Sequence, residues 1–425
     1  MSQASAAPES SRCPIRFEPL SPDQLRDPYP VYARMRAEEP VFYSEPHDLY
    51  VVTRYADAVA VLKDHETFSS QNSVRTSLAP PPPEVATELA RGYPLSPTLT
   101  DSDEPVHRRL RGLVNKAFTH RRVAAMEDPI RRAAGQLIDD FHDDGHADLI
   151  EQFGWSLPLR AICQILGVPE RDIERLHVWS YHWLKLLQAT DPVTDQVSYA
   201  RSVVDMQRYF LEALEARSAN PGEDLMSALL EAAREGDEPL DMVEVMRVPM
   251  NLIIAGHVTV TRAIGNGVVL LLEHPEQRRL MLGDPEALHK GVEELLRLES
   301  PAQGLFRTVR TDAVVGDVTI PSGSRVMVHY AAANRDESQF ERPNEFDLDR
   351  DGLLKHAAFG KGIHVCVGAP LARLELRVVI PLLFERLRGL RLAGEDATER
   401  DVIFFARGFT RVRVEWDVAG EQGGD

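Results

Sequence analysis

The sequence predicts a mainly α-helical fold with a smaller β-rich subdomain. Stretches with apolar residues at helical spacing fill the middle of the chain, and the longest covers residues 242–273. Short runs rich in β-branched and aromatic residues lie near the N-terminus and again after residue 300. A hydrophobic content of 43% in 425 residues is ample for a core. We expect a single domain over residues 15–418, a disordered segment at 1–14 and a flexible tail at 419–425.

Composition excludes several classes of function. The chain has 66 acidic and 48 basic residues, a formal net charge of -18, so we expect no affinity for nucleic acid or anionic membranes. Its cysteines, Cys13, Cys163 and Cys366, share no spacing, which argues against disulfides and for a reducing cytoplasm. No signal peptide is visible, and no run approaches the roughly 18 apolar residues of a membrane span. A soluble cytoplasmic protein is the expectation.

The N-terminal region predicts a small sheet. A helix is expected over 27–36, followed by β-rich runs at 41–43 and 49–52 that a turn joins into a hairpin, and then a helix over 55–63. Residues 68–100 are rich in Ser, Pro and Thr and predict a loop with one short helix at 84–91. Loops of this length in compact proteins are usually functional or disordered.

The helical body begins near residue 103. Asp103 is a plausible N-cap, and His107 and Arg111 are four residues apart, hence on one helix face. Helices are then expected over 121–145, 149–166 and 169–187. The last of these carries Trp179, Tyr181, His182 and Trp183, which either roof a pocket or belong to the core.

The helix predicted over 242–273 contains Gly256 and Thr259. Glycine in a helix interior costs up to about 1 kcal/mol against alanine, so Gly256 indicates the close approach of something flat or a locally opened turn. Thr259 can bond a ligand or the carbonyl four residues before it. Further on, Glu294 and Arg297 are one turn apart and can pair, with Arg342 or Arg350 as a further partner. Strands are expected at 302–309 and over 317–330.

The most informative stretch is residues 359–373. Three glycines, Gly360, Gly362 and Gly368, bracket the lone Cys366, and helical spacing follows directly. Backbone N–H groups and the dipole of the following helix would stabilise a thiolate in such a loop. One thiolate cannot build a structural zinc site, but it can be the axial ligand of a haem iron. The alternative is an inert buried cysteine.

The pattern F-G-x-G-x-H-x-C-x-G-x-x-L-A-R resembles the haem-binding loop of the cytochrome P450 family. The D-x-P-x-H-x-x-x-R segment at 103–111, the A-G-x-x-T segment at 255–259 and E-x-x-R at 294–297 are similar to family motifs and occur in family order. The resemblance implies the cytochrome P450 fold and haem b as cofactor. It assigns to haem contacts the residues His107, Arg111, Ala255, Arg307, Phe359, Gly360, His364, Cys366 and Gly368, with Cys366 as the metal ligand.

The resemblance further implies a monooxygenase that uses O2 and two electrons from a ferredoxin, with ferredoxin reductase and NAD(P)H, to hydroxylate or oxidatively demethylate a small apolar or aromatic molecule. Gly256 and Thr259 would be catalytic, with Thr259 helping to deliver protons. Glu294 and Arg297 would form a structural network. Position 258 is valine where the family has an acid, so a peroxide-driven or otherwise atypical enzyme is an alternative, and a non-catalytic haem sensor is a third reading. Expected substrate contacts are Leu305, Phe404 and Phe405, and a basic patch for the electron donor would comprise Arg108, Arg109 and Lys361.

Overall fold

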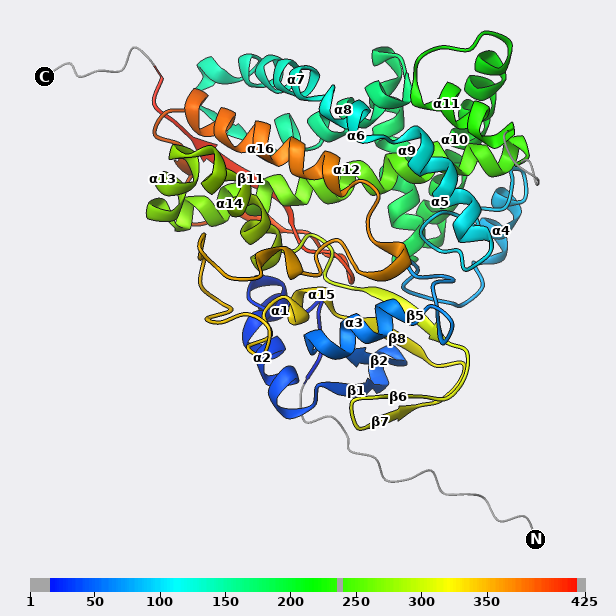
Figure 1. Ribbon diagram of the computed structural model, residues 1–425. Helices are drawn as coiled ribbons and strands as arrows, with labels where there is room; N and C mark the ends of the chain where they lie inside the picture. Colours follow the sequence, from blue (N-terminus) through cyan, green and yellow to red (C-terminus); the bar gives the residue numbers. More distant parts are fainter. Residues whose placement is uncertain (1–15, 235–239, 419–425) are drawn as a thin grey trace, which may run out of the picture.

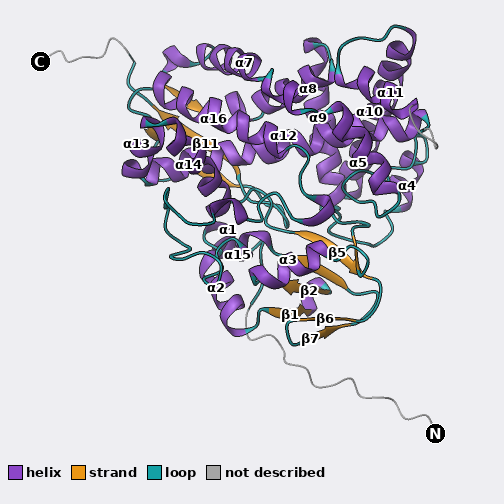
Figure 2. Ribbon diagram, in the orientation of Figure 1, coloured by secondary structure: helices purple, strands orange, loops and turns teal. Residues whose placement is uncertain are grey.

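The computed structural model describes residues 16–234 and 240–418. The segments expected to be disordered or flexible, 1–14 and 419–425, lie outside the described residues. Helices form most of the molecule, and a five-stranded sheet lies at one side of the helical part (Figures 1 and 2). This arrangement confirms the predicted fold class of mainly helical structure with a smaller β-rich part.

The helices are α1 (Pro22–Arg26), α2 (Tyr29–Glu38), α3 (Tyr55–Lys63), α4 (Pro83–Leu89), α5 (Val106–Ala117), α6 (His120–Ala124), α7 (Glu127–Asp139), α8 (Ser156–Leu166), α9 (Ile173–Gln188), α10 (Val193–Ala219), α11 (Leu225–Arg234), α12 (Met242–Glu273), α13 (Pro275–Gly283), α14 (Pro285–Leu298), α15 (Tyr330–Ala333) and α16 (Ala369–Arg386). The strands are β1 (Val41–Ser44), β2 (Leu49–Val52), β3 (Phe68–Ser69), β4 (His146–Asp148), β5 (Leu305–Val309), β6 (Ala313–Val315), β7 (Val318–Ile320), β8 (Arg325–Val328), β9 (Arg391–Leu392), β10 (Thr398–Arg400) and β11 (Phe409–Glu415).

The larger sheet joins distant parts of the chain in the order β1-β2-β8-β5-β3. The predicted hairpin is present, with Val41 opposite Val52 in the antiparallel pair of β1 and β2. On its other side, β2 pairs with β8 in parallel. A second sheet has the order β10-β11-β4, with β9 also paired to β11. Because β5 lies inside the larger sheet, its residues Leu305 and Arg307 are held on a rigid element.

Helix α12 crosses the middle of the helical part (Figure 1) and packs against α8, α9, α10, α14 and α16. Its predicted bounds are confirmed, and Asp241 begins it with a reciprocal capping box to Glu244. The sequence predicted no segment near the length of a membrane span, but by length and composition alone α12 is long and apolar enough to cross a membrane. Its apolar window is 78% buried within the protein, as in a core helix.

Several predicted helices are divided or shifted. The stretch 121–145 contains α6, α7 and a short 3-10 turn, and a π-helical turn at Ile150–Gly154 precedes α8. Helices α10 and α11 were not predicted. The assignment of Asp103 as an N-cap is wrong: Pro105 precedes α5, and the Asp103 carboxylate accepts bonds from Ser69, the Ser70 N–H and Arg310.

Candidate active site

The cysteine loop runs between the 3-10 turn at Gly362–His364 and α16. The Cys366 N–H donates to the carbonyl of Phe359 at 2.9 Å, which closes the loop. Burial raises the pKa of the Cys366 thiol, while N–H groups of Gly368 and Ala369 and the charge of Arg111 act in the opposite direction. The residue is exposed and lines a cavity. A metal cation bound to this sulfur would deprotonate it outright.

Two of the loop glycines have a backbone that other residues rarely adopt. Gly360 and Gly362 have φ of 69° and 73°. A Cβ atom at Gly362 would also collide with the carbonyl of Leu62 in α3, so the loop can approach this helix only without a side chain there. Gly368 is required less strictly, because a Cβ atom there would lie 3.8 Å from the Cys366 sulfur, in ordinary contact.

The basic residues that line the cavity near the cysteine loop include His107 and Arg111 of α5, Arg307 of β5, and Lys361 and His364 of the loop. The His107 and His364 rings are 4.0 Å apart between centroids. Both nitrogens of His107 and Nε2 of His364 are buried without a hydrogen bond within the described chain, although Nδ1 of His107 lies 3.5 Å from Oε1 of Glu104. Burial lowers the pKa of both imidazoles, that of His364 to about 3.

The two arginines of this group bond only to backbone or to neutral oxygen. Arg111 donates to the Val365 carbonyl at 2.6 Å, and Arg307, 4% exposed, donates to the Phe306 carbonyl and contacts the Tyr330 hydroxyl. Neither makes an ion pair with a carboxylate in the described part of the chain. A guanidinium that is buried, as that of Arg307 is, normally pairs with an anion, so this set fits a ligand that brings carboxylates of its own.

On the α12 side, Ala255, Gly256, Val258 and Thr259 line the same cavity. The helix is continuous through these residues, so the opened turn considered for Gly256 is absent. A side chain at Gly256 would meet only Ile162, at 3.6 Å. The Thr259 hydroxyl donates to the Ala255 carbonyl at 2.9 Å, the back-bonded state that its position allows.

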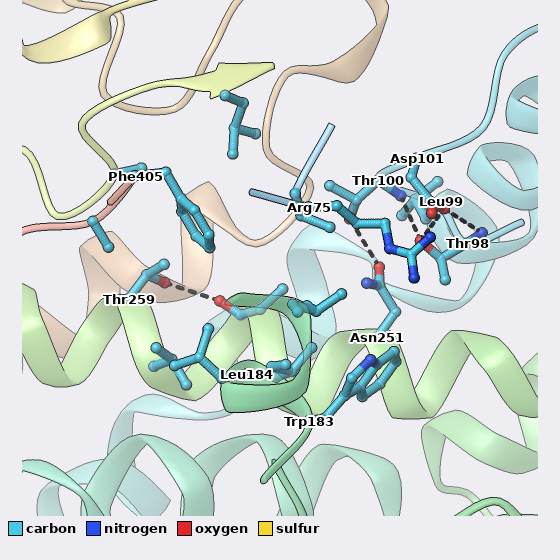
Figure 3. A pocket seen from close by; sticks show the side chains of 18 of the residues that line it. Arg75, Thr98, Leu99, Thr100, Asp101, Trp183, Leu184, Asn251, Thr259 and Phe405 are labelled. Atoms are coloured by element: carbon cyan, nitrogen blue, oxygen red, sulfur yellow. Dashed lines mark hydrogen bonds between the residues drawn. The ribbon is translucent and has the colours of Figure 1, made fainter. Parts of the chain in front are cut away.

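The cavity measures about 930 Å³ and extends from the cysteine loop to α4 and α9. The 68–100 loop supplies much of its wall, as its length suggested, and Leu305 and Phe405 line it too. Figure 3 shows Phe405 on the same side of the cavity as Thr259. The prediction that Phe404 contacts the substrate is corrected by the structure. Its ring packs on Phe17, His47 and Phe306, and the residue is not part of the cavity lining.

Among the aromatic residues 179–183 of α9, Trp183 is the one that lines the cavity in the described part of the chain. Trp179 packs on Tyr209, and His182 bonds Ser202. The core interpretation therefore holds for Trp179, while the pocket interpretation holds for Trp183. Sequence reasoning missed Arg75, Asn251 and Glu375, which also line the cavity. Burial raises the pKa of Glu375 to about 8, and no pattern marked it.

The Glu294–Arg297 pair is fully buried, with Nε and Nη2 of Arg297 each 2.7 Å from a carboxylate oxygen. Arg350 completes the network through Nε at 3.0 Å from Glu294. Arg342 pairs instead with Glu345 and Asp347 at the surface. The sequence left this choice open, and the structure resolves it.

A second buried ion group holds α14 against α16. Glu293 accepts from Arg373 at 2.6 and 2.7 Å and lies 2.9 Å from Nε2 of His356. Burial alone would raise the pKa of Glu293, but these hydrogen bonds lower it to about 2. The Arg373 guanidinium also lies 4.5 Å from the centre of the Phe359 ring. Arg373, the last residue of the loop motif, therefore fixes both ends of the loop.

The expected basic patch is weaker than its sequence suggested. Nε of Arg108 lies 2.8 Å from Glu104, and Nη2 of Arg109 lies 3.8 Å from Glu244. Burial, followed by the charges of Lys63 and Arg373, lowers the pKa of Lys361. Docking of an electron donor at these residues stays a prediction.

Near the cysteine loop, the cavity offers a thiol close to backbone N–H groups and two guanidinium groups without ion pairs. It also offers buried imidazole nitrogens without hydrogen bonds and the small residues Ala255 and Gly256 of α12. This donor set fits a flat metal-bearing group with acidic arms, such as a porphyrin with its propionates. Proteins that hold haem through a thiolate form the class that the fold and this cavity define.

Comparison with known proteins agrees with that class. The family model described as Cytochrome P450 matches residues 281–396. The chain is 35% identical over 414 residues to cytochrome P450 monooxygenase PikC of Streptomyces venezuelae, covering 95% of this chain and 94% of that protein. It is 36% identical to 6-deoxyerythronolide B hydroxylase of Saccharopolyspora erythraea, with 88% and 91% covered. The structure of cytochrome P450 CYP109Q5 from Chondromyces apiculatus superposes with a TM-score of 0.83 at 35% identity, covering 94% of this chain and 98% of that one.

The protein belongs to the cytochrome P450 family. It is a cytochrome P450 monooxygenase with haem b as cofactor, acting on a small molecule with O2 and electrons from redox partners.

Proposed function

We propose that this monooxygenase hydroxylates or oxidatively demethylates a small apolar molecule, aromatic ones included, with electrons from a ferredoxin that is reduced by ferredoxin reductase and NAD(P)H. The observation that carries the proposal is that Cys366 and Thr259 open into one cavity whose lining is mainly apolar. Relatives named as hydroxylases support the same type of reaction.

The residues that would hold the haem follow from the fit. Cys366 would bind the haem iron through its sulfur, and the Gly368 N–H would support the charge of the thiolate. His107, Arg111, Arg307 and His364 would take the propionates, which supply the acceptors that the imidazoles lack and the anions that the guanidinium groups lack. When bound, the haem supplies the activation of dioxygen, favoured by electron donation from the thiolate.

The other roles belong to side chains of the chain itself. Thr259 can exchange its bond to the Ala255 carbonyl for one to a ligand and then hold a proton there. Because their side chains are small, Ala255 and Gly256 leave space in the cavity beside α12. Leu305 and Phe405 exclude water and orient the substrate. Val258 has no titratable group, so we infer that water or a group of the substrate delivers the protons in place of the missing acid.

Val258 also favours a second candidate, an enzyme driven by peroxide, which brings its own protons and electrons. Purified holoenzyme supplied with ferredoxin, ferredoxin reductase, NAD(P)H and O2 should form product from molecules that shift its absorption spectrum. Product with hydrogen peroxide only would favour the second candidate. Spectral shifts without product under both conditions would refute both and leave a haem sensor.

The ligand assignment has a separate test. The reduced carbonyl complex should show the red-shifted band of sulfur ligation, and Cys366→His should lose that band while retaining haem. A wild-type spectrum without the band in the folded holoenzyme would overturn the assignment of Cys366.

A further inference from the structure

The cavity end that lies away from Thr259 and Phe405 carries hydrogen-bond donors without acceptors (Figure 3). They come from three separate segments: Arg75 from the loop before α4, Trp183 from α9 and Asn251 from α12. We call this group the donor end. Apart from the basic side chains near the cysteine loop, which we assigned to the haem propionates, the rest of the lining is mainly apolar. A second group of polar donors at the other end therefore has to be explained by what it binds.

Trp183 contributes a buried donor. The side chain is 4% exposed, and Nε1 has no hydrogen-bond partner among the described residues. Indole nitrogen can only donate, and buried donors are nearly always satisfied in proteins. An acceptor on a bound molecule would satisfy it.

Asn251 is oriented by its neighbour. Its Oδ1 accepts from the Thr100 hydroxyl at 3.1 Å, so the Nδ2 donors are the part of the amide left for a ligand. The side chain is 9% exposed and lines the cavity, and no acceptor for Nδ2 is present in the described chain.

Arg75 adds the charge. Its backbone is fixed, because its carbonyl accepts from Nη2 of Arg325 at 2.5 Å and its N–H donates to Asn72. Arg75 is half-buried and lines the cavity, and its guanidinium makes no hydrogen bond or ion pair with any described residue. Burial and then the charge of Arg75 lower the pKa of Arg325 to about 10, so two cations lie near each other.

The nearby carboxylate does not neutralise this group. Asp101 lines the cavity too, but its oxygens accept from the Ser96 hydroxyl and from the N–H and hydroxyl of Thr98, at 2.6 to 2.7 Å. The Asp101 carboxylate is therefore bound within its own turn, and it makes no ion pair with Arg75 in the described part of the chain. A guanidinium with planar N–H donors beside it matches a carboxylate better than any neutral group.

We propose that the donor end binds a carboxylate of the substrate, so that the substrate is an apolar acid whose hydrocarbon part extends toward Thr259 and Phe405. This inference rests on the proposed function, because it names the polar end of the molecule that the same cavity oxidises. Arg75 supplies the opposite charge, and Trp183 and Asn251 supply neutral donors that fix the orientation.

The test uses holoenzyme and two matched series of probes, straight-chain carboxylic acids from octanoic to hexadecanoic acid and the primary alcohols of the same lengths. Dissociation constants are measured by titration calorimetry and by the spectral shift. The acids should bind about tenfold more tightly than the alcohols, and Arg75→Gln should remove that difference while leaving the alcohols unchanged. Trp183→Phe, which keeps the ring and loses the N–H, should weaken the acids only.

Arg91→Gln is the matched control, because Arg91 lies in the same region but pairs with Glu88 outside the lining. It should leave both series unchanged. Equal binding of acids and alcohols by the wild type, or equal loss of both in Arg75→Gln, would overturn the inference. Turnover of neutral molecules in that case would leave the proposed function intact, whereas tight acid binding without turnover would support the donor end and count against the proposed function.

Discussion

Replacing Arg297 by lysine should cost far more stability than its conservative character suggests. The guanidinium is fully buried and donates to both oxygens of Glu294 and to the carbonyls of Asn334, Pro343 and Glu345, at 2.7 to 3.2 Å. An ammonium has three donors on one nitrogen and cannot reproduce this planar arrangement. Lysine would therefore leave part of a buried carboxylate and several buried carbonyls without donors.

The magnitude follows from those contacts. Breaking a buried ion pair costs about 3–5 kcal/mol, and a buried carbonyl left without a donor costs about 1 kcal/mol or more. Arg350 still donates to Glu294 at 3.0 Å, as does the Asp347 N–H at 3.1 Å, so the carboxylate keeps partners. We expect a loss of about 4 kcal/mol in the free energy of unfolding, a large share of the 5–15 kcal/mol typical of a domain.

The measurement is urea unfolding of the holoenzyme, followed by circular dichroism at fixed haem saturation. Arg342→Lys is the matched control, because Arg342 also pairs with two carboxylates, at 2.8 and 2.7 Å, but is exposed. That variant should lose less than about 1 kcal/mol. If the two variants lost the same amount, burial would not determine the cost and the reasoning would be refuted.

Three further predictions concern α12 and the cysteine loop. Val258→Glu should raise the fraction of electrons that reach product rather than peroxide. Nη1 of Arg262 donates to the carbonyl of residue 258 at 3.0 Å, so a cation lies near the new acid. An unchanged fraction would show that the missing acid is not limiting. Gly362→Ala should cost about 1–3 kcal/mol more in thermal unfolding than Gly323→Ala, because both have positive φ but only Gly362 has a backbone carbonyl where the methyl group would lie; equal costs would contradict this. Burial lowers the pKa of His257 from 6.5 to about 3, so the unfolded chain binds a proton that the folded chain excludes, and stability is lost as the pH falls below 6.5. As the pH falls from about 7 to about 5, the free energy of unfolding of His257→Leu should therefore rise by about 2 kcal/mol relative to that of the wild type. Urea unfolding of both proteins at several pH values measures this difference, and a difference that does not change with pH would contradict the prediction.

The sequence predicted elements best where a strong local pattern had a matching tertiary role. The bounds of α3 and α12 were predicted correctly, since apolar periodicity continues to both ends and Asp241 provides a cap for α12. Asp103 shows the limit of such patterns. It has the composition of a cap, but Arg310 and the backbone of residue 70 compete for the same carboxylate from distant parts of the chain.

Among the site residues, those within one motif were found and those set by packing were not. The loop around Cys366 and the helix with His107 reach one cavity, as the motifs indicated. Sequence reasoning treated Phe404 and Phe405 alike, although neighbouring side chains point in different directions and only Phe405 faces the cavity. The choice between Arg342 and Arg350 likewise depended on which one is buried against α14.

The two ends of the cavity therefore differ in how the chain encodes them. The thiol end lies in one short loop, so its chemistry can be inferred from local sequence. The donor end exists only because α9 and the loop before α4 lie beside α12, which brings together Arg75, Trp183 and Asn251, and none of these belongs to a motif. Since these side chains make no ion pairs that support the described fold, their substitution should change which molecules bind without loosening the haem. Selection for new substrates can thus act on the donor end while the thiol end stays fixed.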